Sequence, residues 1–463
     1  MSKKIVLFEN RIDCCGCGAC SDICPKNAIK MADGIGGYRY PQIDCSLCIS
    51  CGTCLKVCPI KKRKTHDIEQ KNKPHIKIVN YGMFNNFGAV IAASCLESVV
   101  RSMVPENYEV QTLDYDSDFE CTNSYRIFRQ NFQNGFDFIR LFFEKMHIVK
   151  PKDNCTDEVY HSDSILRNRR YKKFRNRFLN YSVSMNVYDL DNDDDNDKAL
   201  ICGSDVIWFP PRIFLRTYKG YYLDFGPENA KRISYAASVD SKVNFKLLWR
   251  WFIYKYRLRN FDFISVRETA NLKFIQSATN KNAVQCIDPV LLFDAEDFEN
   301  MLSESELEDK DEDYIYAYIL MKNDEAFEYV KHLAKEKNMK IYYFADYYTD
   351  FGKDSVDCFS DGPAEFLHRI KNAKYIVTTS FHCIVFSMIF KKQFLAFDRG
   401  NDSIKIPDIL ELFKMSDRLF DPKKNSDIDM QIDFERTNNI IKEYRGKSLE
   451  FLGNALNDFR TEK

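Results

Sequence analysis

Eight cysteines near the start of the chain form two runs with the same spacing, C-x2-C-x2-C-x3-C-P. The first run contains Cys14, Cys17, Cys20 and Cys24, and the second contains Cys48, Cys51, Cys54 and Cys58. Of the chain's 17 cysteines, ten lie between positions 14 and 58 and the other seven are scattered singly. Because a disulfide scaffold would be short and evenly studded with cysteine, crowding at one end of a long chain indicates metal ligation by thiolates.

The two runs resemble the iron-sulfur motifs of bacterial two-cluster ferredoxins, and the resemblance covers residues 9–60. In such proteins the fourth cysteine of each run binds the cluster of the other run. The resemblance therefore implies two [4Fe-4S] clusters, one held by Cys14, Cys17, Cys20 and Cys58 and the other by Cys48, Cys51, Cys54 and Cys24. Zinc is the alternative metal, but the prolines and the three-residue gap favour iron-sulfur. Cys15 and Cys45 fall outside the spacing and are expected to be non-ligating thiols.

The overall composition limits the classes of function. With 463 residues the chain fits two or three domains, and its net charge of −1 argues against nucleic-acid binding. The first residues lack the pattern of a signal peptide, and no apolar run approaches the ~20 residues that span a bilayer. We therefore expect a cytoplasmic protein, with peripheral contact to the inner face of the plasma membrane as a further option.

The residues beyond the cysteine runs predict an α/β fold with parallel sheets, because short apolar runs alternate with amphipathic stretches. A charged segment at 61–75 separates domain 1–60 from the rest and is typical of a solvated linker. An acidic hinge at 296–313 divides a first half, 76–295, from a second half, 314–463, which ends in a closing helix. Strands are expected at 76–80, 199–202, 232–238, 262–266, 314–320 and 375–379.

Several short phrases occur beyond residue 76, most of them near the ends of predicted strands. They are NNFGA (85–89), GSDVIW (203–208), SYAAS (234–238), SVRE (265–268), IDPVLL (287–292) and TTSFH (378–382). In this order they resemble the polysaccharide pyruvyl transferase family. The resemblance implies a GT-B-like pair of facing Rossmann-like domains, here preceded by the small ferredoxin-like domain. Two positions depart from the family pattern, Val206 where glutamine often follows GSD and Cys383 where glycine usually follows the histidine.

The resemblance also implies an activity. Family members transfer the enolpyruvyl unit of phosphoenolpyruvate to a sugar as a cyclic ketal, and the acceptor here would be a polyprenol-linked glycan in capsular or exopolysaccharide biosynthesis. Arg267, just after a strand, offers a planar fork for the donor's carboxylate or phosphate. His382, at a strand-to-helix junction, would act as a general acid. The substrate-binding residues would be Ser380, Asp205, Glu268, Asn86 and Gly88.

Two other functions fit the same sequence. One is an iron-sulfur electron-transfer protein that serves a reductase partner, and the other is a transferase whose clusters sense the redox state. Against electron transfer, no G-x-G-x-x-G cofactor loop follows any predicted strand, and ketal formation involves no net redox change. The sequence leaves the role of the clusters open between structural support, redox sensing and electron transfer.

Two stretches, 167–178 and 246–261, mix lysine and arginine with large aromatic residues. In the second stretch Leu247, Trp251, Tyr254 and Leu258 share one helical face. A surface helix packed by that face is the simpler interpretation. The alternative is an interfacial helix that brings the protein to an anionic membrane surface.

Overall fold

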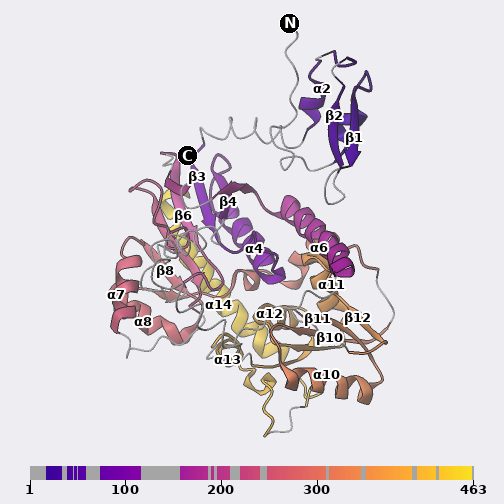
Figure 1. Cartoon of the computed structure of the whole chain (residues 1–463). Helices are drawn as coiled ribbons and strands as arrows, with labels where there is room; N and C mark the ends of the chain where they lie inside the picture. Colours follow the sequence, from indigo (N-terminus) through magenta and orange to yellow (C-terminus); the bar gives the residue numbers. More distant parts are fainter. Residues whose placement is uncertain are drawn as a thin grey trace, which may run out of the picture. The chain divides into compact units, whose positions relative to one another are not determined.

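The chain divides into two compact units, Met1–Pro74 and His75–Lys463 (Figure 1). The predicted ligand Cys14, the spare thiols Cys15 and Cys45, most of the linker 61–75 and Leu247 lie outside the residues that the structure describes. This computed structural model describes residues 17–33, 39–44, 46–49, 51–58, 73–115, 157–185, 189–191, 195–208, 219–239, 248–308, 312–345, 351–398, 404–423 and 427–460.

The N-terminal unit contains two short helices and a hairpin. β1 (Ile29–Asp33) pairs antiparallel with β2 (Arg39–Ile43), and Cys20 and Cys54 share a small buried cluster with Ile29. α1 (Ala19–Asp22) and α2 (Thr53–Val57) each follow a left-handed glycine between two cysteines, Gly18 with φ 77° and Gly52 with φ 72°. The two cysteine runs therefore fold into equivalent turns.

The first half of the larger unit is built on a seven-stranded parallel sheet. Its order is β5 (Tyr181–Met185), β4 (Glu109–Tyr115), β3 (His75–Val79), β6 (Asp197–Cys202), β7 (Lys231–Ala237), β8 (Phe263–Val266) and β9 (Val284–Gln285). In the centre, Ile76 of β3 lies opposite Val110 of β4 and Ala199 of β6. The chain builds the sheet outward from β3 in one direction and then from β6 in the other. The order thus reverses between β3 and β6, as in Rossmann folds.

The second half repeats this plan on a five-stranded parallel sheet, whose order reverses between β10 and β13. The strands are β12 (Ser355–Asp357), β11 (Lys340–Ala345), β10 (Tyr314–Ile319), β13 (Tyr375–Thr378) and β14 (Gln393–Ala396). All the strands expected from the sequence are present, within one or two residues. The prediction of an α/β chain with two Rossmann-like domains is confirmed.

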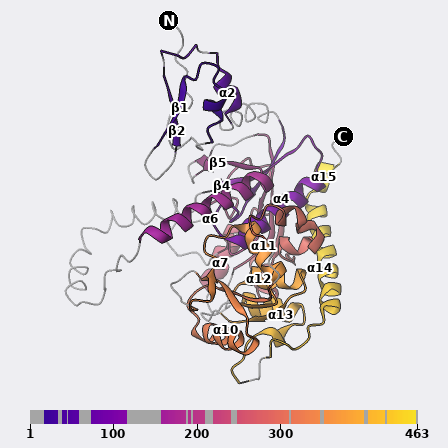
Figure 2. The same ribbon diagram turned by 90° about the vertical axis from the view of Figure 1, so that its right-hand side faces the viewer.

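Helices connect the strands and cover the sheets (Figures 1 and 2). In the first half they are α4 (Phe87–Met103), α6 (Asp157–Phe178), α7 (Leu248–Arg257) and α8 (Thr269–Thr279). α9 (Glu299–Leu302) belongs to the segment that joins the two halves. In the second half the helices are α10 (Asp324–Lys337), α11 (Pro363–Asn372), α12 (Phe381–Ile389), α13 (Lys405–Leu412), α14 (Phe434–Ala455) and α15 (Asn457–Arg460). None of the helices in the described ranges is long and apolar enough to cross a membrane.

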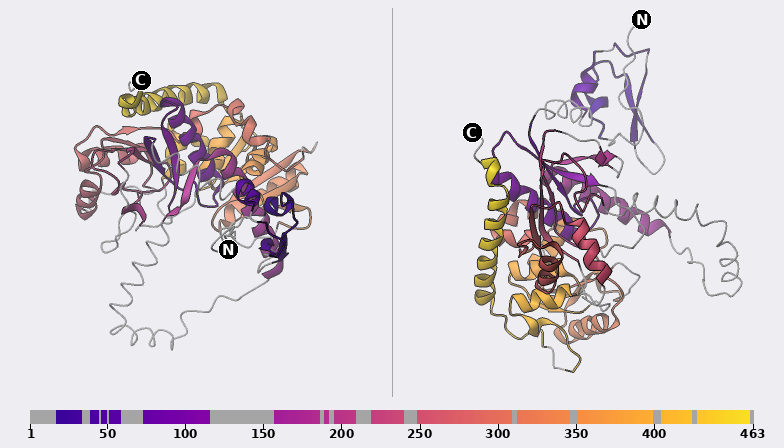
Figure 3. Two further views of the ribbon diagram at one scale, coloured as in Figure 1. Left: turned by 90° about the horizontal axis from the view of Figure 1, so that it is seen from above. Right: turned by 90° about the vertical axis from the view of Figure 1, so that its left-hand side faces the viewer.

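The two halves pack against each other through one continuous hydrophobic cluster. Phe87, at the start of α4, is fully buried, with its ring centroid 4.9 Å from that of Phe366 in the second half. The long helix α14, drawn in yellow near the end of the chain, runs along both halves (Figure 3). From it Arg445 donates to the Leu291 carbonyl and pairs with Asp294 at 2.7 Å, so the end of the chain is tied back to the first half.

The basic helix α6 provides a second connection between the halves. Arg170 lies 3.3 Å from the carboxylate of Glu306, in the acidic segment after α9, and 3.5 Å from that of Glu365 on α11. Arg169 and Lys173 contact the same acidic segment. Both the basic stretch and the acidic hinge seen in the sequence therefore have a structural partner.

Candidate active site

The predicted site residues follow strands at the carboxyl ends of the two sheets, and of these strands β6 and β13 flank the reversal points. Asp205 follows β6, while Arg267 and Glu268 follow β8. In the second half, Ser380 and His382 follow β13. Because ligands of open parallel sheets bind beyond the carboxyl ends of strands near such reversals, these positions are where a substrate is expected.

Arg267 is the centre of a group of charged side chains. Its Nη1 lies 2.9 Å from Asp288 Oδ2 and its Nε lies 3.2 Å from Glu268 Oε1. Its Nη2 lies 3.8 Å from Asp205 Oδ1 and makes no hydrogen bond, although the side chain is only 4% exposed. The guanidinium carbon also lies 4.0 Å from the ring centroid of Phe381, at the start of α12. Arg267 therefore touches both halves.

His382 joins this group from the second half. Its Nε2 is 3.7 Å from Asp288 Oδ2, and the residue as a whole is 7% exposed. A Cβ at Gly88, in the first turn of α4, would lie 2.1 Å from the imidazole Cγ. Glycine is required there because the imidazole rests directly on the α4 backbone. The N-termini of α4 and α12 thus converge, and their aligned peptide dipoles favour negative charge at this place.

Asp288 and Lys405 complete the group and were not identified as site residues from the sequence. Asp288 is fully buried and accepts hydrogen bonds from Ser204 Oγ at 3.2 Å and from Arg267. Lys405 begins α13, and its Nζ is 3.7 Å from Asp205 Oδ1. Asp288 lies in the IDPVLL phrase, which was a signal for it, whereas nothing in the local sequence singles out Lys405.

The positive and negative side chains of this group stabilise one another's charged forms. Burial would raise the pKa of Asp205, but Lys405 and Arg267 outweigh it and hold that pKa below its ordinary value. Burial likewise opposes ionisation of Asp288, yet interaction with His382 and the charge of Arg267 lower its pKa. Burial would lower the pKa of Arg267, but Glu268 and Asp288 raise it. Both aspartates and the arginine are therefore charged at neutral pH.

Two of the predicted binding residues use their side chains to cap helices. Asn86 accepts a hydrogen bond from the Ala89 amide at the start of α4, and Ser380 accepts one from the Cys383 amide at the start of α12. Asn86 is exposed and Ser380 is buried. Glu268 contacts Arg267 through one oxygen, while its other oxygen is buried without a hydrogen-bond partner. The ligand-binding roles of these residues remain predictions.

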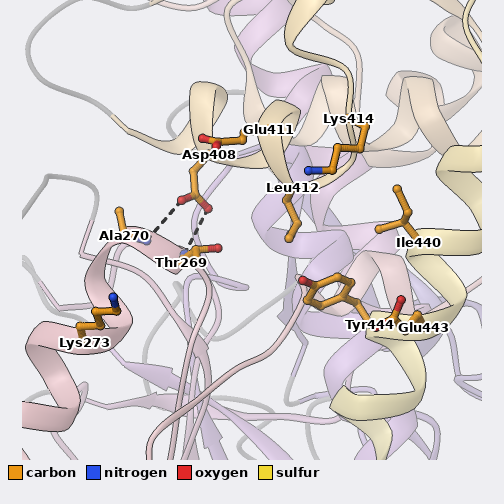
Figure 4. Close-up of a pocket in the computed structure, with 10 residues that line it drawn as sticks. All are labelled: Thr269, Ala270, Lys273, Asp408, Glu411, Leu412, Lys414, Ile440, Glu443 and Tyr444. Carbon is orange, nitrogen blue, oxygen red and sulfur yellow. Dashed lines mark hydrogen bonds between the residues drawn. The ribbon is translucent and has the colours of Figure 1, made fainter.

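A cavity of about 650 Å³ lies between α8, α13 and α14 (Figure 4). At its wall, Asp408 of α13 accepts hydrogen bonds from the Thr269 and Ala270 amides of α8, at 3.2 and 3.3 Å. Burial, together with the nearby charge of Glu268, raises the pKa of Asp408 to about 6. This contact connects the second half to the first half. It lies next to Glu268, because Thr269 is the following residue.

In the N-terminal unit, none of the run cysteines that the structure describes forms a disulfide. Within the described ranges, no three His, Cys, Asp or Glu side chains gather tightly enough to hold a single metal ion. The four cysteines of a cubane bind four different irons, so their sulfurs stand farther apart than the ligands of one ion. A donor set made only of thiols at this spacing suits such clusters.

Two facing Rossmann-like domains with charged residues at their meeting carboxyl edges define an α/β protein of GT-B-like architecture. The profile of the family described as polysaccharide pyruvyl transferase matches residues 86–401, and that of a 4Fe-4S dicluster domain matches residues 13–62. The chain therefore belongs to the polysaccharide pyruvyl transferase family and carries an N-terminal 4Fe-4S dicluster domain. Its family makes it a transferase that modifies polysaccharide.

Solved structures with a similar arrangement include UDP-N-acetylglucosamine 2-epimerases. The putative enzyme from Listeria monocytogenes is 9% identical with a TM-score of 0.37, over 84% of this chain and 92% of its own. The enzyme from Neisseria meningitidis bound to UDP-GlcNAc is 7% identical with a TM-score of 0.39, and the match covers 83% of this chain and 98% of that enzyme's chain. No curated protein matches the chain.

Proposed function

We propose that the protein transfers the enolpyruvyl unit of phosphoenolpyruvate onto two hydroxyl groups of a sugar, forming a cyclic ketal in capsular or exopolysaccharide biosynthesis. The observation that carries this proposal is the meeting of Arg267 and His382 from opposite halves on the same carboxylate, Asp288, beside two helix N-termini. Such a place suits a small donor that carries both a carboxylate and a phosphate.

Donor binding falls to the cationic groups. The unpartnered Nη2 of Arg267 supplies a buried donor that a carboxylate or phosphate oxygen can satisfy. Lys405, held 3.7 Å from Asp205, brings a second positive charge from α13. The start of α12 adds backbone N–H groups around Phe381 and His382.

Proton transfer falls to His382 and a carboxylate. His382 donates a proton to the methylene carbon of the donor, which becomes a methyl group, and a sugar hydroxyl attacks the adjacent carbon. The phosphate then leaves, and a second hydroxyl closes the ring. Of the two hydroxyl protons released, one restores His382 and the other leaves with phosphate, so the reaction balances without an oxidant. We assign the acceptance of a hydroxyl proton to Asp205, because at 18% it is the most exposed carboxylate of the group.

The acceptor we propose is a polyprenol-linked glycan, and the N-terminal unit would hold two [4Fe-4S] clusters. Such clusters supply one-electron transfer when bound. Because ketal formation transfers no net electrons, we assign the unit a structural or regulatory role rather than a step in the reaction.

The test is anaerobic incubation of the full chain with phosphoenolpyruvate and a panel of lipid-linked sugars. We expect acceptor-dependent phosphate release and a product heavier by one pyruvate less one water. R267K and H382Q should each lower kcat/KM by about 100-fold, since one loses planar two-point capture and the other the general acid. The control R169K changes an arginine that is 64% exposed and should keep full activity. No phosphate release with any sugar, or normal turnover by H382Q, would overturn the proposal.

A further inference from the structure

We propose that the outer face of α7 is a docking surface for an anionic lipid bilayer. This proposal concerns where the protein works and does not depend on the transfer reaction. Residues 246–261, which include α7, contain five lysines and arginines and no acidic residue. The whole chain has a net charge of −1, so this local excess of positive charge is not a general property of the protein.

One face of α7 is firmly attached to the first half. Tyr254 and Leu258 are fully buried, and the Tyr254 hydroxyl donates to the Trp208 carbonyl at 3.0 Å. Trp251 donates from Nε1 to Ser277 Oγ of α8, also at 3.0 Å. α7 therefore lies beside α8 as a fixed part of the first half (Figure 1). The simpler interpretation of the sequence, a packed surface helix, accounts for this face.

The opposite face has no such explanation. Phe252 is 62% exposed and Tyr256 is 60% exposed, and they are neighbours at i and i+4 on the helix. Within the part of the chain that the structure describes, they are the only aromatic side chains among the large exposed hydrophobics. Two aromatic rings kept side by side in water favour a partner that offers an apolar medium.

The flanking cations identify the chemistry of that partner. Lys255 and Arg259 are exposed, and Arg259 covers the Tyr256 ring with its guanidinium carbon 3.8 Å from the centroid. Arg257 is different, because it lies 3.8 Å from Asp224. Aromatic rings at headgroup depth, with lysine and arginine beside them, are the pattern of helices that lie in an anionic membrane interface. A nucleic acid would need a wider basic face than one helix supplies.

The experiment is co-sedimentation of the full chain with phosphatidylcholine vesicles that contain or lack about 30% phosphatidylglycerol, at about 50 mM salt. We expect retention on the anionic vesicles and release at high salt. F252S/Y256S should weaken binding at least tenfold, and K255E/R259E should weaken it more than tenfold, since each cation contributes roughly fivefold. All four side chains are exposed, so thermal melting should confirm that both variants fold.

Matched controls change other exposed positions. V183S alters a side chain that is 75% exposed, and K322E one that is 72% exposed; both should bind as the unaltered protein does. Replacing the basic residues 61–64 by glutamine should also leave most binding intact. The proposal is wrong if the unaltered protein is not retained on anionic vesicles, or if F252S/Y256S binds normally. A further result would also contradict the proposal. In it, the unaltered protein does not bind vesicles but forms a dimer by light scattering, and F252S/Y256S is monomeric.

Discussion

Replacing Gly88 by alanine tests whether the two halves meet as the structure shows. The added Cβ would lie 2.1 Å from Cγ, 2.2 Å from Nδ1 and 2.4 Å from Cβ of His382. Ordinary contact begins at 3.4 Å, so α4 and the imidazole must separate by about 1.3 Å. Overpacking of this kind costs about 1–3 kcal/mol of stability. Since a misplacement of about 1 Å can cost 100-fold in rate, we expect G88A to lose about that factor in phosphate release.

A double-mutant cycle separates this clash from other effects of the substitution. In H382G the imidazole and its Cβ are both absent, so G88A should cost almost nothing in that background. The free energy of unfolding, measured by urea denaturation of all four proteins, gives the coupling directly. If G88A costs the same with and without the His382 side chain, the contact between α4 and α12 is not as described.

Gly446 supplies the matched control. It lies inside α14, and a Cβ there would meet nothing within 4 Å. Alanine at this position should therefore raise stability by about 0.4–1 kcal/mol, because it lowers the entropy of the unfolded chain without a clash. G446A should keep full activity. A loss of activity in G446A would show that helix substitutions disturb the protein generally, and the effect of G88A would then carry no weight.

Three further predictions concern the contact between the halves and the clusters. R170M should lower the free energy of unfolding, measured by urea denaturation, by about 3–5 kcal/mol, because Arg170 is 10% exposed and faces three carboxylates. R169M should lower it by less than about 1 kcal/mol, because Arg169 is 64% exposed. Asp408 has a pKa raised to about 6 chiefly by burial, so its ionisation opposes folding; the melting temperature should fall as pH rises through 6, and D408N should lack that fall. Iron analysis after anaerobic reconstitution should give about eight irons per chain, about four in C24S and about eight in C15S.

The sequence predicted the elements whose signal is local. The predicted bounds of strands with clear apolar runs, such as β3 and β10, agree with the observed bounds within one residue. β4 and β11 were not predicted, although they are internal strands of their sheets. β4 reads EVQTLDY, and its polar residues do not stand out from a loop unless its pairing with β3 is known. Pairing, rather than composition, decides β4. β11 reads KIYYFA, and its isoleucine and aromatic residues were a strand signal that went unused.

The difference between local signals and long-range contacts also explains which site residues could be predicted. Arg267 and His382 could be found because each follows a strand within a family phrase. Lys405 could not, since its importance comes from a contact with Asp205 in the other half. Gly88 was a weak signal as a lone glycine in a turn, and its reason is again a contact across the halves. A residue whose role depends on a contact between two domains cannot be identified from the sequence immediately around it.

The charge balance of the site follows from this docking. Asp205, Glu268 and Asp288 face Arg267, Lys405 and His382, so the cations do not outnumber the carboxylates even when His382 carries the proton that the proposed reaction requires. An anionic donor cannot then be drawn in by excess positive charge alone. It must replace a carboxylate as the partner of Arg267, whose Nη2 still lacks a hydrogen bond, and the helix N-termini at α4 and α12 must favour that exchange. Because Arg267 and His382 are 4% and 7% exposed, the proposed donor would reach them only if the two halves moved apart.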